Sequence, residues 1–99
     1  MIRKNIHING LEHYNLSIED LKFLCNDFNI ILELDPLNIY DENAIKCKIN
    51  EIHFGYIEQY SSYWVSALLE QKYEYKVEIL VFKSTSLYIR VEFTPPPQN

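Results

Sequence analysis

The stretch that decides the fold is LDPLNIYDENAIK, from Leu34 to Lys46, in which a polar loop separates two short apolar segments. The mainly apolar residues 29–34 predict a strand, which Asp35-Pro36 stops. Residues 44–49 alternate between apolar and polar, which predicts a second strand whose inward face carries Ile45, Cys47 and Ile49. The loop between them exceeds the about two to five residues of an ordinary hairpin link. Its polar side chains are therefore the first candidates for a functional site.

The rest of the chain predicts a mainly β domain with two helices. A short helix begins at Ser17, whose hydroxyl can cap it, and a longer helix spans residues 59–71. On the longer helix, four residues recur at helical spacing and are expected to face the sheet: Tyr60, Trp64, Ala67 and Leu68. Six strands are expected, at residues 2–8, 29–34, 44–49, 52–57, 74–82 and 87–93. Because few β–α alternations occur, this order favours a small curved antiparallel sheet or barrel capped by helices.

The length of 99 residues suits a single domain. We expect that domain to span residues 1–94 and to be followed by a disordered tail at 95–99, because Pro95–Pro97 cannot continue a β-ladder. No apolar run reaches the roughly 18 to 20 residues of a membrane-spanning helix, and the first residues lack the apolar stretch of a signal peptide. The sequence therefore predicts a cytoplasmic protein that does not associate with membranes.

Motifs for catalysis or metal binding are absent from the sequence. It contains no G-x-S-x-G, no HExxH and, with two glycines, no glycine-rich phosphate loop. Cys25 and Cys47 lack metal-ligand spacing and are predicted to be free thiols. The acids Asp35, Asp41 and Glu42 do not have the spacing of a calcium loop. We therefore expect no enzymatic activity, no cofactor and no metal.

Charge is distributed unevenly along the chain. The formal net charge is −5, but residues 12–42 hold eight acids and one lysine, a balance of −7. Nonspecific affinity for nucleic acid comes mostly from cations that displace condensed counterions, so this chain is not a general duplex binder. Any role with nucleic acid must therefore be local and must depend on a small pocket.

The loop offers side chains that suit such a pocket. Tyr40 can stack on a flat ring, Asp41 can accept a hydrogen bond from a hydroxyl, and the amide of Asn38 can donate and accept. The alternative is that the loop organises itself: Asn38 and Asp41 then form side-chain-to-backbone turns, Asn43 caps the loop and Tyr40 covers an edge of the core. Residue types alone leave both interpretations open.

The same loop resembles the centre of the HIRAN domain, in which an apolar strand and a proline precede the pattern Asn-x-Tyr-Asp-x-Asn-Ala-Ile. Here that pattern is Asn38 to Ile45, and the Gly-aromatic step that leads into a helix follows as FGYI at residues 54–57. Gly10-Leu11 in the first turn also suits the family. The resemblance covers about residues 5 to 93. It implies an OB-like barrel of six strands with two helices.

The resemblance also implies a function, because helicase-linked HIRAN domains hold the free 3′ end of a single DNA strand. By position, Asn38, Tyr40 and Asp41 would form the centre of such a pocket. Six further residues are candidates for contacts around it: His13, Tyr14, Tyr56, Gln59, Lys46 and Lys48. This chain departs from the helicase-linked pattern at Glu12, which replaces a basic residue, at His13, which replaces an aromatic one, and at Gln59, which lacks a positive charge.

Two functions follow from these observations. The first is a non-catalytic module that binds single-stranded DNA at its 3′-hydroxyl end, in DNA repair or replication or in a phage–host context. The second is an acidic protein-binding or DNA-mimicking regulator, whose −7 segment would face the basic groove of a nuclease or helicase. In both cases we expect a monomer or a weak homo-oligomer.

Overall fold

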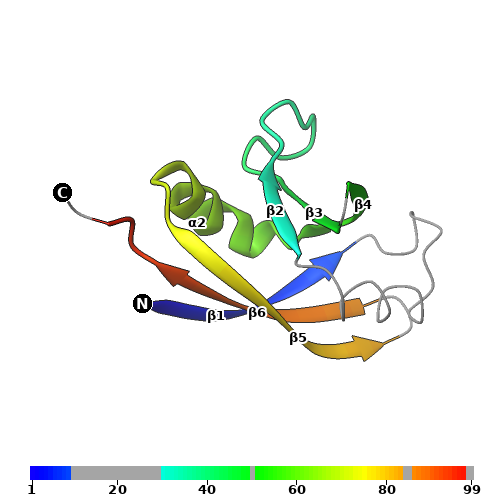
Figure 1. Cartoon of the computed structure of the whole chain (residues 1–99). Coiled ribbons are helices and arrows are strands. Elements are labelled where there is room, and N and C mark those ends of the chain that lie inside the picture. The colour runs from blue at the N-terminus through cyan, green and yellow to red at the C-terminus, as the bar shows by residue number, and fades with distance from the viewer. Residues whose placement is uncertain (10–29, 50, 84–85, 98–99) are drawn as a thin grey trace.

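The computed structural model describes residues 1–9, 30–49, 51–83 and 86–97. This part of the chain forms six strands and one helix, and their arrangement is shown in Figure 1. They are β1 (Ile2–Asn9), β2 (Ile31–Leu34), β3 (Ile45–Ile49), β4 (Ile52–Ile57), α2 (Gln59–Glu70), β5 (Glu74–Lys83) and β6 (Ser86–Thr94). The six predicted strands are confirmed. The described residues hold one helix rather than the predicted two, since the segment that begins at Ser17 lies outside them.

The strands form one antiparallel sheet in the order β2-β3-β4-β1-β6-β5. The predicted hairpin of β3 and β4 is confirmed. Strand β1 lies centrally, and its register with β6 runs from Ile2 opposite Phe93 to Ile8 opposite Leu87. On its other side β1 pairs with β4 only at Ile8 and Asn9. Among the described strands, the beginning of β1 therefore pairs with β6 alone.

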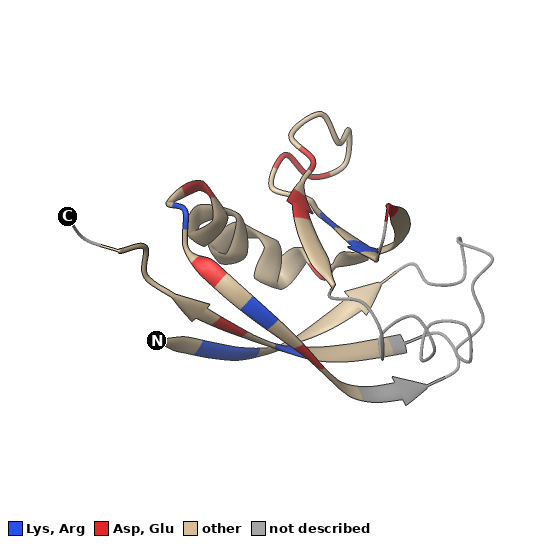
Figure 2. Cartoon of the chain, viewed as in Figure 1, with Lys and Arg blue, Asp and Glu red and all other residues tan. Residues whose placement is uncertain are grey.

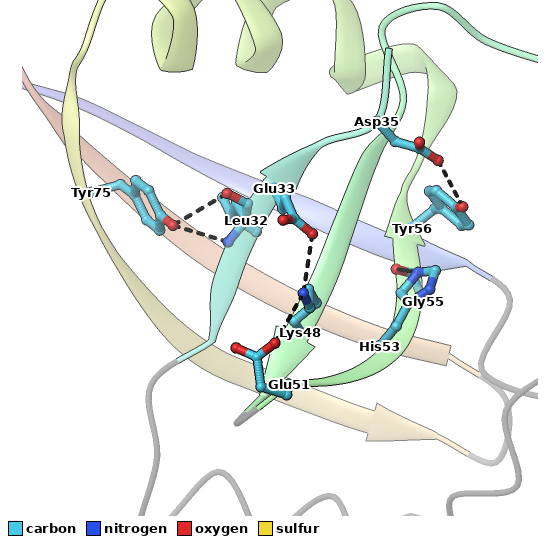
Figure 3. Close-up of polar contacts among 9 residues, drawn as sticks. All are labelled: Leu32, Glu33, Asp35, Lys48, Glu51, His53, Gly55, Tyr56 and Tyr75. Atoms are coloured by element: carbon cyan, nitrogen blue, oxygen red, sulfur yellow. Dashed lines mark hydrogen bonds and ion pairs between the residues drawn. The ribbon is translucent and has the colours of Figure 1, made fainter. Parts of the chain in front are cut away.

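The sheet curls until its two outer strands approach each other, which confirms the expected barrel-like architecture. The hydroxyl of Tyr75 on β5 accepts a hydrogen bond from the N–H of Leu32 on β2 at 2.9 Å. The same hydroxyl donates to the carbonyl of Leu32 at 3.4 Å (Figure 3). One side chain thus bridges the outer strands β2 and β5.

The core lies on the concave side of this sheet. The predicted inward residues of β6 are fully buried, as are those of β3: Leu87, Ile89, Val91 and Phe93, with Ile45, Cys47 and Ile49. The thiol of Cys47 is free, as predicted, and burial raises its pKa. Cys25 lies outside the described residues.

Helix α2 packs on the core with a face that agrees only in part with the one predicted. Tyr60 is 89% exposed, so its expected place against the sheet is wrong. Trp64 and Leu68 do pack on the core, and the Trp64 ring meets that of Phe93 edge-on at a centroid distance of 6.1 Å. The fully buried face carries mainly serines and is made up of Ser61, Ser62, Val65 and Ser66. Polar residues occupy this face because the helix also packs against the polar loop between β2 and β3.

Candidate nucleic-acid interface

The loop between β2 and β3 is organised by its own side chains. Oδ1 of Asn38 accepts hydrogen bonds from the backbone N–H groups of Tyr40 at 2.8 Å and Asp41 at 3.1 Å. Oδ1 of Asp41 accepts from the N–H of Asn43 at 2.9 Å. The base of the loop is closed by the N–H of Asp35, which donates to the carbonyl of Ala44 at 2.9 Å. The expectation that Asn38 and Asp41 form side-chain-to-backbone turns is therefore confirmed.

Two serines of α2 attach the loop to the helix. The hydroxyl of Ser62 donates to Oδ2 of Asp41 at 2.8 Å, and that of Ser66 donates to Oδ1 of Asn43 at 3.5 Å. Sequence reasoning missed both serines. The available signal was their spacing of four residues, which places two hydroxyls on one helical face.

These contacts leave the Asp41 carboxylate with spare capacity. One of its oxygens accepts from Asn43 and the other from Ser62, while each carboxylate oxygen has two lone pairs. The group is fixed in orientation by one bond to the loop and one to the helix. It can still accept a further hydrogen bond from a ligand.

The far side of the loop is anchored to β4. The hydroxyl of Tyr56 donates to Oδ2 of Asp35 at 3.0 Å (Figure 3). The same oxygen accepts from Nδ2 of Asn38 at 3.3 Å. The Tyr56 ring meets the imidazole of His53 edge-on at 4.8 Å, and Nε2 of His53 contacts the carbonyl of Gly55 at 3.0 Å. Burial is the main cause that lowers the pKa of His53.

A hollow of about 230 Å³ lies between this loop, the end of β4 and the start of α2. This volume is below the about 300 Å³ at which pockets for drug-sized ligands begin, so the hollow suits one small group. Five of the predicted residues line it, namely Asn38, Tyr40, Asp41, Tyr56 and Gln59. Sequence reasoning missed its other lining residues, Asn9, Ala44 and Ile57.

The interpretation of a self-organised loop expected Tyr40 to cover an edge of the core. The structure contradicts that expectation. The side chain of Tyr40 is 86% exposed although it lines the hollow. The loop hydrogen-bonds the Tyr40 backbone, which positions the residue and leaves its ring available to solvent. The ring is therefore available as a stacking surface beside the Asp41 carboxylate.

The two candidate lysines lie outside the hollow. Lys46 is opposite Tyr56 in the β3–β4 ladder. The ammonium group of Lys48 contacts carboxylate oxygens of Glu33 at 3.2 Å and Glu51 at 3.6 Å (Figure 3). The hydrogen bond that it donates to Glu33 is the main cause that raises the pKa of Lys48. His13 and Tyr14 lie outside the described residues.

Charge around the hollow is sparse. Among the described residues that line it, Asp41 alone carries a formal charge. Figure 2 shows acidic segments on the loop above β2, while basic segments lie on β1, β3 and β5. The described lining thus joins two aromatic rings, three amides and a carboxylate without a cation, a set that suits a hydroxyl-bearing aromatic ligand better than a phosphate.

The described residues offer neither a membrane span nor a metal centre. No helix among them combines the length and the apolar character needed to cross a bilayer. No group of three or more His, Cys, Asp or Glu side chains in the same part of the chain is arranged to hold a metal ion.

Comparison with known proteins gave two matches at the level of family and fold. A profile of the HIRAN domain matches residues 5–95. Among solved structures, the crystal structure of the HIRAN domain of human HLTF superimposes with a TM-score of 0.74 at 20% identity. That match covers 92% of this chain and 74% of the solved chain, so it shows a shared fold. No curated protein matches the sequence.

Proposed function

This chain belongs to the HIRAN domain family, and from that premise we propose that it is a DNA-binding module for the free 3′-hydroxyl end of a single strand. The observation that carries the proposal is the exposed Tyr40 ring beside the oriented Asp41 carboxylate, at a hollow of about 230 Å³. A module of this kind would act in DNA repair or replication, alone or beside a helicase or nuclease.

Asp41 supplies the discrimination between ends. Its remaining lone pairs accept a hydrogen bond from a 3′-hydroxyl, and charge-assisted hydrogen bonds of this kind are among the stronger ones in proteins. A terminal phosphate would instead bring negative charge against the carboxylate. No cation among the described lining residues offsets that repulsion. The site therefore favours unblocked ends.

Tyr40 supplies most of the affinity. Stacking of a base on an aromatic side chain is worth about 1–3 kcal/mol and tolerates any base, since every base has a π-face. The side chains of Gln59 and Asn38 carry amide groups for the sugar and base edges. The proposed binding is therefore indifferent to sequence and has a short footprint.

The alternative role as a DNA mimic has less support in the described residues. A mimic needs acids that present their charge to a partner. Two of the acids in the −7 segment are engaged within this chain, Glu33 with Lys48 and Asp35 with Tyr56. Four others, Glu12, Glu19, Asp20 and Asp27, lie outside the described residues.

The experiment that tests the proposal compares a linear single-stranded oligonucleotide with the same sequence closed into a circle. Fluorescence anisotropy at low salt should detect binding to the linear strand and at least tenfold weaker binding to the circle, which has no 3′ end. Tyr40→Ala should weaken binding of the linear strand by about 5- to 150-fold, the equivalent of one stacking contact. Tyr63→Ala is the matched control, since Tyr63 is 74% exposed on α2 and does not line the hollow. Equal binding of the linear and circular strands would rule out end recognition.

A further inference from the structure

Asp35 contacts the loop through its backbone and through its side chain. The N–H of Asn38 donates to the carbonyl of Asp35 at 3.1 Å, which closes a four-residue turn with Pro36 in its second position. Proline is favoured at this position because its ring presets the backbone angle φ. The two end residues of such a turn lie close together, and Nδ2 of Asn38 donates to Oδ2 of Asp35 at 3.3 Å. The sequence Asp-Pro-x-Asn thus brings these two side chains into contact.

The amide of Asn38 is held in one of its two orientations by its partners. Its Oδ1 accepts from the N–H groups of Tyr40 at 2.8 Å and Asp41 at 3.1 Å, while its Nδ2 faces the Asp35 carboxylate. The reverse orientation would place Oδ1 against that carboxylate and Nδ2 against two N–H donors, so no hydrogen bond could form on either side. The acceptor on Asp35 therefore selects the orientation in which the amide orders the backbone of Tyr40 and Asp41.

The same carboxylate oxygen also fixes one wall of the hollow. Tyr56 on β4 lines the hollow, and its hydroxyl donates to Oδ2 of Asp35 at 3.0 Å (Figure 3). Asp35 itself is not among the described residues that line the hollow. One acceptor outside the hollow thus connects the loop that carries Tyr40 and Asp41 to the strand that carries Tyr56.

We infer that Asp35 is a positioning residue of the proposed 3′-end site, which holds the loop and the Tyr56 ring in place and does not contact DNA itself. The inference rests on the proposed function, because the site that Asp35 orders is the one we assign to the DNA end. A ligand that must order a loop loses binding energy to that ordering, and a loop that is already ordered avoids the loss. Both partners of Asp35 donate to it, so the role needs an acceptor rather than a charge. Asp35→Asn keeps an oxygen that can accept both bonds, whereas Asp35→Ala keeps none.

Binding of a linear oligonucleotide with a free 3′-hydroxyl tests the role in DNA recognition. By fluorescence anisotropy we expect at least tenfold weaker binding by Asp35→Ala and binding like that of the parent by Asp35→Asn. Glu42→Ala is the matched control, because Glu42 is exposed in the same loop and its replacement removes the same charge. Parent-like binding by Asp35→Ala, or an equal loss in Asp35→Asn, would overturn the inference alone. Absence of binding by the parent would overturn the proposed function as well.

Hydrogen exchange without DNA shows whether Asp35 acts through the loop. The amides of Tyr40 and Asp41 donate to Asn38, so their exchange reports how firmly the Asn38 side chain is held. We expect at least tenfold faster exchange at both amides in Asp35→Ala, and rates like those of the parent in Asp35→Asn and Glu42→Ala. Weaker DNA binding by Asp35→Ala with unchanged exchange at these amides would mean that Asp35 does not act by ordering the loop, and would contradict the positioning role.

A second pair of variants tests the contact between Asp35 and Asn38 even if Asp35→Ala folds poorly. In the parent background, Asn38→Asp sets two carboxylates against each other. In the Asp35→Asn background the same change faces an amide that can donate to it, and the net charge equals that of the parent. We therefore expect Asn38→Asp to lower the midpoint of urea unfolding in the parent background and to leave it unchanged in the Asp35→Asn background. An equal effect in both backgrounds would show that the two side chains are not coupled, and would overturn the inference.

Discussion

The hydroxyl of Ser62 on α2 donates a 2.8 Å hydrogen bond to Oδ2 of Asp41 in the loop between β2 and β3. Ser62 is 1% exposed, so this bond is shielded from water. It joins two elements that are 21 residues apart in sequence and fixes the carboxylate that we assign to end recognition. The site therefore depends on the helix as much as on the loop.

Replacing Ser62 should weaken both stability and binding. Because hydrogen bonds to charged groups contribute about 1.5–3 kcal/mol, Ser62→Ala should lower the free energy of unfolding by that amount in urea denaturation. Ser66→Ala is the comparison, since the Ser66 hydroxyl lies 2.9 Å from the carbonyl of Tyr63 on its own helix and 3.5 Å from Oδ1 of Asn43, so its bond to the loop is the weaker one and its loss should cost less. Equal stability of Ser62→Ala and the parent protein would show that the bond does not hold the loop.

Removing the hydroxyl of Tyr75 should weaken the contact between the outer strands β2 and β5. Tyr75→Phe keeps the ring and deletes the group that accepts from the N–H of Leu32 and donates to its carbonyl. A buried donor left without its partner costs about 1–3 kcal/mol, so we expect a loss of stability in this range and faster hydrogen exchange at the Leu32 amide. Exchange at the Leu32 amide that stays as slow as in the parent would contradict the bridging role.

Stability should fall at alkaline pH because of Cys47. Burial raises the pKa of its thiol above the ordinary 9.0, so above that pH the unfolded chain loses a proton that the folded chain keeps. The free energy of unfolding should then fall by about 1.4 kcal/mol per pH unit through this group. The measurement is the difference between the parent and Cys47→Ala in urea melts from pH 8 to pH 10. A difference that does not change across this range would show that the thiol is not buried.

Binding of single-stranded DNA should depend weakly on salt. Each phosphate contact by a cation adds about 0.7 to the slope of log affinity against log salt for single strands. The hollow has no cation among its described lining residues. Lys46 pairs with the lining residue Tyr56 in the β3–β4 ladder and is therefore our candidate for a phosphate contact. We expect a slope of about 1 or less, and a Lys46→Ala variant with a slope closer to zero. A slope of about 3 or more would mean that phosphate contacts dominate.

The strands were predictable from the sequence because their burial follows a period of two. Ile45, Cys47 and Ile49 on β3 are all fully buried, as the alternation predicted. The turns at Asn38 and Asp41 were predictable for a similar reason, since the side chains of both residues accept hydrogen bonds from backbone N–H groups two to three residues later. Such contacts depend on neighbours in sequence, and a pattern of residue types can indicate them.

The orientation of α2 was not predictable in the same way. A helical apolar stripe favoured Tyr60 over Ser62 as a packed residue, yet Tyr60 is exposed and Ser62 is buried. The reason is a polar partner, Asp41, that only the tertiary fold brings to the helix. The bridge between Tyr75 and Leu32 is of the same kind, since it joins strands that are 43 residues apart in sequence.

The most direct test of end recognition is the ratio of two dissociation constants, for oligonucleotides that carry a 3′-phosphate and a free 3′-hydroxyl. For the parent protein we predict a ratio of at least ten in favour of the hydroxyl, because the Asp41 carboxylate accepts from the hydroxyl and repels the phosphate. In Asp41→Asn the repulsion is gone, and the ratio should fall toward one. A ratio near one in the parent, or an equal ratio in both proteins, would contradict the claim that this carboxylate recognises the 3′ end.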